Sequence, residues 1–332
     1  MKVLLTKPFL ESDLEYISER LADGIEIVKP SAFTPEAIAN SAADADVLFG
    51  GNLAEPILQA AKNLKFAQIP WTGVDNLDFD LLKKYDVTIA NSHSNAVIVA
   101  EHGVALMLDA AKKISYHDRQ MRHGEWNRVK PAGNEVSPFS KLVVGSKVAL
   151  LGFGAIGQGL YKILSGFGCK FSIFSRSGKA VAGFENAQYF QTQDIYRQLD
   201  DIDFVFLALP LTPDSKNLVD AKFLSAMNNR SVLINLSRGE LVNEDDLFKA
   251  LQEKQIGAAA IDVWYNYPKS GETVTFPSEK HDFHKLDNIT LSPHRAGYAD
   301  SGFLHLDDAI DNLNNYKTGK PLKNVISLND KY

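Results

Sequence analysis

Short apolar runs alternate along this chain with longer stretches in which apolar positions recur at helical spacing. Near the start, the runs KVLLT (2–6), IEIVKP (25–30) and DVLFGG (46–51) are separated by SDLEYISERLA (12–22) and PEAIANSA (35–42). Later runs predict strands at 148–151, 171–174, 203–209, 231–236, 258–263 and 289–292. Strands that alternate with helices form parallel sheets with helices on their faces, so the pattern predicts the α/β fold class.

The same pattern divides the chain into two domains. A long helical stretch at 95–114 leads into a polar connector, and a second series of strands begins after it. The helix expected at 303–316 and the short tail behind it are too small for a domain of their own. We therefore predict a discontinuous domain of residues 1–98 and 297–332, and a second domain of residues 99–296.

Composition narrows the function classes. A net charge of −6 gives no reason to expect nucleic acid or an acidic membrane as a partner, and no apolar run approaches the roughly 18 residues of a membrane span. The single cysteine, Cys169, excludes an internal disulfide and suits a reducing compartment, so we expect a cytoplasmic protein. The segment HDFH (281–284) has no third group of ligands beside it, so we expect a solvated loop and no metal site.

The hexapeptide GFGAIG follows the apolar strand expected at 147–151. It contains Gly152, Gly154, Ala155, Ile156 and Gly157. This spacing lets a strand turn tightly into a helix, whose N-terminus then faces a pyrophosphate. A helix expected at 158–167, ended by Gly168, and the next strand at 171–174 complete the unit. The motif predicts a dinucleotide site, and a glycine-rich turn without a ligand is the alternative.

Several special residues follow the expected strands of the second domain, at the sheet edge where ligands bind in this fold class. They are Ser175, Arg176, Pro210, Arg238, Asp262 and His294. Each has a plainer interpretation: Arg238 as a surface ion pair, Asp262 as a turn residue, His294 as a loop residue. The shared edge favours a binding site, because loop charges placed at random would not select one edge.

Longer motifs extend over nearly the whole chain. They are WTGVDNLDFDLLKKYDVTIAN (71–91), SHSNAVIVAEH (92–102), LPLTPDSKNLVD (209–220), INLSRGELVNEDDL (234–247) and SPHRAG (292–297). In these motifs the chain resembles the D-2-hydroxyacid dehydrogenases, the D-isomer-specific family of NAD(P)-dependent oxidoreductases. The resemblance implies two Rossmann-like or flavodoxin-like parallel-sheet domains with a cleft between them. It also implies a homodimer, formed through the second domain and the long helix.

The resemblance assigns roles to matching positions. Arg238 would hold the carboxylate of a 2-keto acid, and His294 would be the general acid/base. The first domain would bind the substrate through amides of Gly51, Asn52, Gly73 and Val74. The second would bind the cofactor through the glycine motif, Ser175, Arg176, Pro210, Ser237 and Asp262.

One departure from the family pattern concerns the cofactor. NAD enzymes of this fold place an acidic residue at the end of the second strand, where it binds the ribose 2′-hydroxyl. Here Ser175 and Arg176 occupy that place, with Lys179 nearby. Hydroxyls and cations suit a 2′-phosphate, so we predict NADP(H) in preference to NAD(H).

A second departure concerns the acid/base pair. The family glutamate lies five positions beyond the strand-end aspartate, and Tyr267 stands there, before Pro268. A phenol can orient His294 by a hydrogen bond but brings no charge to stabilise an imidazolium. The sequence leaves open whether a carboxylate of the following loop replaces the glutamate. The candidates are Glu272, Glu279 and Asp287.

These features predict an oxidoreductase that transfers hydride between NADP(H) and a small 2-keto or 2-hydroxy acid, as D-2-hydroxyacid dehydrogenases and glyoxylate/hydroxypyruvate reductases do. Arg238, His294 and Tyr267 form its expected catalytic group. Two alternatives remain at this point: an NAD(P)-sensing binding protein with little catalysis, and a hydride-abstracting enzyme similar to formate dehydrogenase that needs no proton transfer to oxygen.

Overall fold

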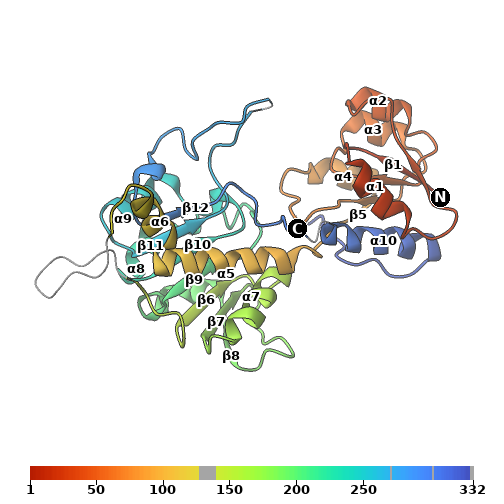
Figure 1. Ribbon diagram of the computed structural model, residues 1–332. Helices are drawn as coiled ribbons and strands as arrows, with labels where there is room; N and C mark the ends of the chain where they lie inside the picture. Colours follow the sequence, from red (N-terminus) through yellow and green to blue (C-terminus); the bar gives the residue numbers. More distant parts are fainter. Residues whose placement is uncertain (127–139, 270, 301–302, 330–332) are drawn as a thin grey trace, which may run out of the picture. The chain divides into compact units, whose positions relative to one another are not determined.

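A computed structural model describes residues 1–126, 140–269, 271–300 and 303–329. The chain forms two compact units (Figure 1). Unit 1 comprises Met1–Asn95 and Ala299–Tyr332, and unit 2 comprises Ala96–Tyr298. Unit 1 is therefore built from both ends of the chain.

Unit 1 follows the strand and helix alternation of the sequence. Its elements are β1 (Lys2–Leu5), α1 (Glu11–Ser18), β2 (Glu26–Val28), α2 (Pro35–Asn40), β3 (Val47–Phe49), α3 (Glu55–Ala60), β4 (Phe66–Gln68), α4 (Phe79–Tyr85), β5 (Thr88–Ala90), the short 3-10 turn η5 (Leu304–Leu306) and α10 (Asp307–Thr318). The strands described in this unit form a five-stranded sheet in the order β2-β1-β3-β4-β5, and all neighbours are parallel. The chain thus changes direction across the sheet between β1 and β3, which makes this point the topological switch of unit 1.

Each face of the unit 1 sheet has its own core. Leu4 and Leu48 point to the face covered by α2, α3 and α4, whereas their neighbours Val3 and Phe49 point to the other face. That second face is covered by α1 and by Ile310 and other residues of α10. The helix near the C-terminus therefore completes the core of a sheet that the first ninety residues build.

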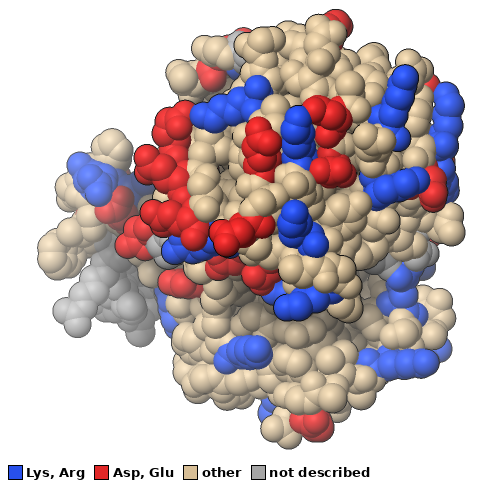
Figure 2. All heavy atoms as spheres, turned by 90° about the vertical axis from the view of Figure 1, so that its right-hand side faces the viewer, with Lys and Arg blue, Asp and Glu red and all other residues tan. Residues whose placement is uncertain are grey.

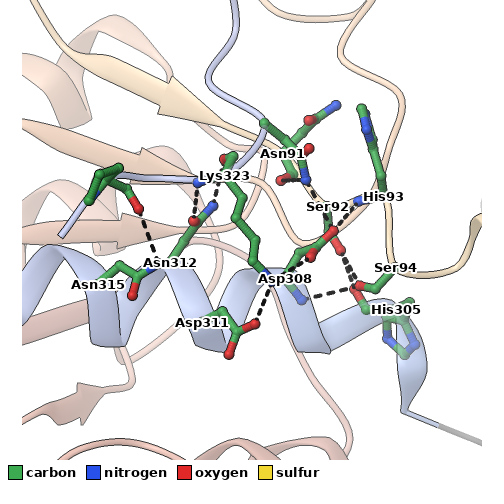
Figure 3. Close-up of polar contacts among 12 residues, drawn as sticks. Asn91, Ser92, His93, Ser94, His305, Asp308, Asp311, Asn312, Asn315 and Lys323 are labelled. Atoms are coloured by element: carbon green, nitrogen blue, oxygen red, sulfur yellow. Dashed lines mark hydrogen bonds and ion pairs between the residues drawn. The ribbon is translucent and has the colours of Figure 1, made fainter. Parts of the chain in front are cut away.

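A polar network ties this returning segment to the chain that leaves the sheet after β5 (Figure 3). The Asp308 carboxylate accepts hydrogen bonds from the His93 backbone N–H at 2.9 Å and from Asn324 Nδ2 at 3.0 Å. Ser92 Oγ donates to the His305 carbonyl at 2.7 Å. Burial lowers the pKa of the His93 imidazole. The network fixes the last residues of unit 1 before the chain enters unit 2.

Unit 2 contains the elements expected after residue 95 and several more. They are α5 (Ala96–Lys112), α6 (Ile114–Arg122), β6 (Lys147–Leu151), α7 (Ala155–Ser165), β7 (Lys170–Ser175), β8 (Ala187–Gln191), η1 (Thr192–Arg197), η2 (Leu199–Asp201), β9 (Phe204–Leu207), α8 (Ala221–Ala226), β10 (Val232–Asn235), η3 (Gly239–Leu241), α9 (Glu244–Gln252), β11 (Ala258–Ile261), η4 (Phe283–Lys285) and β12 (Ile289–Leu291). In the described part of the unit these strands form a seven-stranded parallel sheet, β12-β11-β10-β9-β6-β7-β8. Its switch point lies between β6 and β9.

The long helix α5 is a core element of unit 2. Its residues Val104 and Met107 pack with Leu160 of α7 and Ile234 of β10. A Cβ on Gly159 would lie 2.8 Å from the Ala100 Cβ, so the close approach of α7 to α5 depends on a glycine there.

The α/β class and the two parallel sheets are confirmed, and three local expectations are corrected. The helix after the glycine motif spans Ala155–Ser165 instead of 158–167, because the helix begins at once after Gly154 and ends at the Gly166 cap, before Gly168. The helical stretch 95–114 is broken at Lys113, whose backbone is left-handed at φ 57°. Strand β8 was not expected, because this edge strand is partly exposed and carries glutamines.

No helix of the described ranges is both long and apolar enough to cross a membrane. On the face drawn in Figure 2, basic and acidic side chains lie side by side.

Candidate active site

The candidate residues of unit 2 lie at one edge of its sheet. The glycine motif follows β6, Ser175 ends β7, Pro210 comes after β9, Ser237 and Arg238 follow β10, Asp262 follows β11, and His294 follows β12. Because all these strands are parallel, their carboxyl ends meet at the same edge. The glycine motif and Pro210 flank the switch point between β6 and β9.

The glycine motif leaves space for a phosphate-bearing ligand. Gly152 has φ 93°, and a Cβ there would lie 2.3 Å from the Ala208 carbonyl oxygen. A Cβ on Gly157 would lie 2.5 Å from the Gly152 oxygen, so both glycines are required by close packing. A Cβ on Gly154 would meet nothing within 4 Å, and no side chain caps the N-terminus of α7. Open space in front of uncapped amide groups of Ala155 and Ile156 fits a pyrophosphate.

The end of β7 carries hydroxyl and cationic groups in place of a carboxylate. Ser175 Oγ accepts a hydrogen bond from the Gly178 N–H at 3.2 Å, which stabilises the turn. A hydroxyl that accepts in this way can still donate its own hydrogen. Arg176 and Lys179 are exposed on the same turn. The turn therefore carries hydroxyl and cationic side chains where a carboxylate would repel a phosphate.

Arg238 is held by the loop after β10. Asn235 Nδ2 donates to the Arg238 carbonyl at 2.8 Å, and the Ser237 N–H donates to Asn235 Oδ1 at 3.1 Å. The Arg238 guanidinium donates to the Ser237 carbonyl at 2.8 Å. A Cβ on Gly239 would lie 2.5 Å from the Trp264 carbonyl oxygen, so this loop packs directly on the segment after β11.

His294 has a left-handed backbone at φ 53°, a conformation that costs free energy for a residue with a Cβ. The loop is held by Asp262, whose side chain is 1% exposed. The Asp262 carboxylate accepts hydrogen bonds from Ser292 Oγ and from the backbone N–H groups of Arg295 and Ala296, the last two at 3.0 Å. Asp262 thus stabilises the turn that presents His294, and contact with a cofactor stays a prediction.

Sequence analysis missed two residues that support the same turn. Trp264 is buried, and its indole Nε1 donates to the Ser292 carbonyl at 2.8 Å. His102 Nε2 of α5 lies 3.0 Å from Ser292 Oγ. Only the motif SPH could have drawn attention to Ser292, and nothing in the sequence pairs it with residue 102.

Tyr267 lies beside His294. Their ring centroids are 5.5 Å apart at an angle of 55°. The Tyr267 hydroxyl accepts a hydrogen bond from the Trp264 N–H at 3.0 Å. Burial raises the pKa of this hydroxyl, while that hydrogen bond and the positive charge of Arg238 act in the opposite direction. The phenol is therefore neutral at physiological pH. Tyr267 lies beside His294 and near enough to Arg238 for the guanidinium charge to act on its hydroxyl. A hydrogen bond between Tyr267 and His294 stays a prediction.

The expected substrate loops of unit 1 also lie at a carboxyl edge. Gly51 and Asn52 follow β3, and Gly73 and Val74 follow β4. A Cβ on Gly51 would lie 2.5 Å from Trp71 Cζ2, so the two loops touch through the indole ring. The Val74 side chain is buried in the core, which leaves its backbone as the part able to meet a ligand.

The segment HDFH is engaged in local contacts. His281 lies 2.7 Å from Asp245 and stacks on Phe248, and His284 stacks on Phe276. Within the described ranges, no group of three or more His, Cys, Asp or Glu side chains could hold a metal ion.

Residues 104–296 match the family model "D-isomer specific 2-hydroxyacid dehydrogenase, NAD binding domain". The chain belongs to this family. Because the match contains the glycine motif and the edge residues of unit 2, this unit holds the family's NAD(P)-binding domain.

Two relatives and one solved structure illustrate the range of this family. A glyoxylate reductase of Pyrococcus furiosus is 27% identical over 88% of this chain and 85% of its own length. A D-3-phosphoglycerate dehydrogenase of Archaeoglobus fulgidus is 26% identical over 99% of this chain, which spans only 59% of that longer protein. The fold is shared with an NADPH-dependent glyoxylate/hydroxypyruvate reductase of Sinorhizobium meliloti, with a TM-score of 0.78 at 23% identity over 98% of both chains. Family membership makes this protein an NAD(P)-dependent oxidoreductase.

Proposed function

We propose that this family member reduces a small 2-keto acid to the 2-hydroxy acid with NADPH, as D-2-hydroxyacid dehydrogenases and glyoxylate/hydroxypyruvate reductases do. The observation that carries the proposal is the grouping of Arg238, Tyr267 and His294 at the edge of unit 2 that also holds the glycine motif. Turnover of glyoxylate, hydroxypyruvate and bulkier 2-keto acids with NADPH tests it.

Each group has a distinct role in this proposal. Arg238 binds the substrate carboxylate through its planar guanidinium and polarises the keto group. His294 donates a proton to the carbonyl oxygen during reduction and removes it during oxidation. The bound cofactor supplies hydride to the keto carbon. Backbone amides of Gly51, Asn52, Gly73 and Val74 receive the substrate.

The cofactor would lie along the carboxyl edge of unit 2. The uncapped N-terminus of α7 and the open space at Gly154 would receive the pyrophosphate, and Ser175 and Arg176 would hold the ribose phosphate. The rest of the cofactor would lie beside Pro210, Ser237 and Asp262. Asp262 would make this contact while its carboxylate still holds the His294 turn.

NADPH is expected to be used with a higher kcat/KM than NADH. Arg176→Ala removes a cation from the β7 turn and should lower kcat/KM for NADPH about 10- to 100-fold, the usual effect of losing hydrogen bonds to a charged group. The value for NADH should change by less than about two-fold, since no 2′-phosphate is then present. Initial rates at fixed keto acid measure both.

Arg197→Ala is the matched control, because this arginine is exposed and pairs with Asp194 at 3.7 Å. It should leave both values unchanged. A wild-type enzyme that prefers NADH, or an Arg176→Ala variant that loses both cofactors equally, would reject the assignment.

Tyr267→Glu is expected to extend keto acid reduction to higher pH. A carboxylate beside His294 favours the imidazolium that donates the proton, so the alkaline limb of the kcat/KM profile should move up by about one pH unit or more. In the wild type the neighbouring phenol is neutral, because burial raises the pKa of Tyr267. Profiles of kcat/KM for keto acid reduction between pH 5 and 10 locate the alkaline limb.

Tyr267→Phe keeps the ring and loses the hydroxyl, and its alkaline limb should stay where the wild-type limb lies. Identical limbs in the wild type and Tyr267→Glu would show that His294 protonation does not control the reaction. That result would favour the second candidate function, a hydride abstraction without proton transfer, for which the neutral Tyr267 is the supporting observation.

A sensor that binds NAD(P) with little catalysis is the remaining alternative. The placement of Arg238 and His294 at the same edge of the unit 2 sheet argues against it. We further propose that the protein is cytoplasmic and that it forms a homodimer. Light scattering measures its mass in solution and so decides the oligomeric state.

A further inference from the structure

Lys7 lies at the switch point of the unit 1 sheet. It comes two residues after the end of β1, and the Gly50–Asn52 loop follows the neighbouring strand β3. A Cβ on Gly50 would lie 3.2 Å from Lys7 Cγ, so the lysine stem rests on that loop. In open α/β sheets, the crevice outside the strand ends at the switch point is where ligands bind.

The Lys7 ammonium lies among aromatic rings. Nζ is 4.4 Å from the ring centroid of Trp71 and 5.2 Å from that of Phe9. Trp71 in turn abuts Gly51, so the ammonium, the indole and the β3 loop form one surface. These are the same loops that carry the proposed substrate amides.

No carboxylate of the described residues forms an ion pair or hydrogen bond with Lys7. Burial lowers the pKa of its ammonium, and the more distant charge of Asp13 only partly opposes this. An ammonium withdrawn from water gains from cation–π contacts, but an anion offsets the lost hydration much better. The position is thus prepared for an anionic ligand group.

Thr6 gives an independent sign that this edge meets a ligand. Its side chain is 2% exposed, and its hydroxyl oxygen has no hydrogen-bond partner in the described part of the chain. A Cβ on Gly50, whose φ is 136°, would lie 2.5 Å from this oxygen. Buried hydroxyls without partners are rare, so this hydroxyl calls for a partner that the described chain does not itself supply.

We propose that Lys7 binds a second anionic group of the substrate, so that the preferred substrates are 2-keto acids whose side chain carries a carboxylate or a phosphate. This inference rests on the proposed function, in which Arg238 already takes the carboxylate next to the keto group. In that function Arg238 neutralises only the carboxylate next to the keto group, so a second anionic group of the substrate needs a cation of its own. Lys7 acts as a specificity-determining residue and takes no part in hydride or proton transfer.

Matched substrate pairs test this directly. They are 2-ketoglutarate against 2-ketovalerate, and 3-phosphohydroxypyruvate against hydroxypyruvate. The wild type should favour the more highly charged member of at least one pair by about 10-fold or more in kcat/KM, and which pair does so distinguishes carboxylate from phosphate. Lys7→Met keeps the stem packed on Gly50 and should abolish that preference, while changing the less charged member less than about two-fold.

Lys7→Arg keeps the cation and should keep most of the preference, and thermal melting shows whether each variant is folded. Equal losses for both members of a pair in Lys7→Met, or a wild type without preference for charge, would overturn the assignment while the proposed function stands.

A wild type that reduces no keto acid would instead reject the proposed function. Calorimetric titration with succinate and butyrate, two acids that cannot be reduced, then tests on its own whether Lys7 binds an anionic group. Tighter binding of succinate that disappears in Lys7→Met supports the assignment, and equal binding of the two acids overturns it.

Discussion

His294→Asn is expected to lower kcat for 2-keto acid reduction by about 10²- to 10⁴-fold, the usual contribution of a general acid. Asparagine is the best replacement, because it tolerates the left-handed backbone at φ 53° better than alanine does. The Asp262 hydrogen bonds to the Arg295 and Ala296 N–H groups do not involve the imidazole, so the turn should persist. Stopped-flow measurement of NADPH oxidation gives the rate.

NADPH affinity should stay within about two-fold of the wild type, because the imidazole contributes only to the acid/base step. His284→Asn is the matched control, since His284 stacks on Phe276 in a local contact. A His294→Asn variant that retains wild-type kcat would remove His294 from the mechanism and would favour hydride abstraction without an acid/base step.

Arg238→Met is expected to lower kcat/KM for keto acids by about 10²- to 10³-fold, because removing one partner of a buried charge pair commonly costs 2–5 kcal/mol. Arg238→Lys should recover only part of the loss, because an ammonium cannot bind a carboxylate in the bidentate geometry of a guanidinium. Steady-state kinetics with glyoxylate and with a bulkier acid measure both variants.

Arg197→Met changes an exposed arginine in the same way and should keep wild-type kinetics. If Arg238→Met changed only the KM for NADPH, the guanidinium would have to be assigned to the cofactor. The hydrogen bond from Asn235 to the Arg238 carbonyl holds the backbone in either case.

Much of the fold was predictable because the central strands of both sheets are parallel and buried. Each such strand is a short apolar run, and β6 coincides with the run before the glycine motif. Edge strand β8 was not predicted because it is partly exposed and carries polar residues. The break at Lys113 was not predicted because the apolar periodicity continues past it. Local patterns therefore locate the core strands better than the edges and helix ends.

The candidate site was predictable only in part. Arg238 and His294 stood out because each follows a strand, and strand order then places them at one edge. The contacts that hold the His294 turn, from Asp262 and Trp264, depend on tertiary packing that no local pattern encodes. Lys7 was overlooked for the same reason, since Gly50 and Trp71, which it contacts, lie in the loops after β3 and β4 and are distant from it in sequence.

The central claim is that this protein reduces 2-keto acids with NADPH by means of Arg238 and His294. The most direct measurement is NADPH oxidation by the purified wild-type protein with glyoxylate, hydroxypyruvate, 2-ketoglutarate and 2-ketovalerate, with His294→Asn measured alongside. The account predicts turnover of at least one acid, with the D-2-hydroxy acid as product wherever the product is chiral, and with a loss of about 10²-fold or more in the variant. Binding of NADPH without turnover of any acid, or equal turnover by wild type and variant, would contradict it.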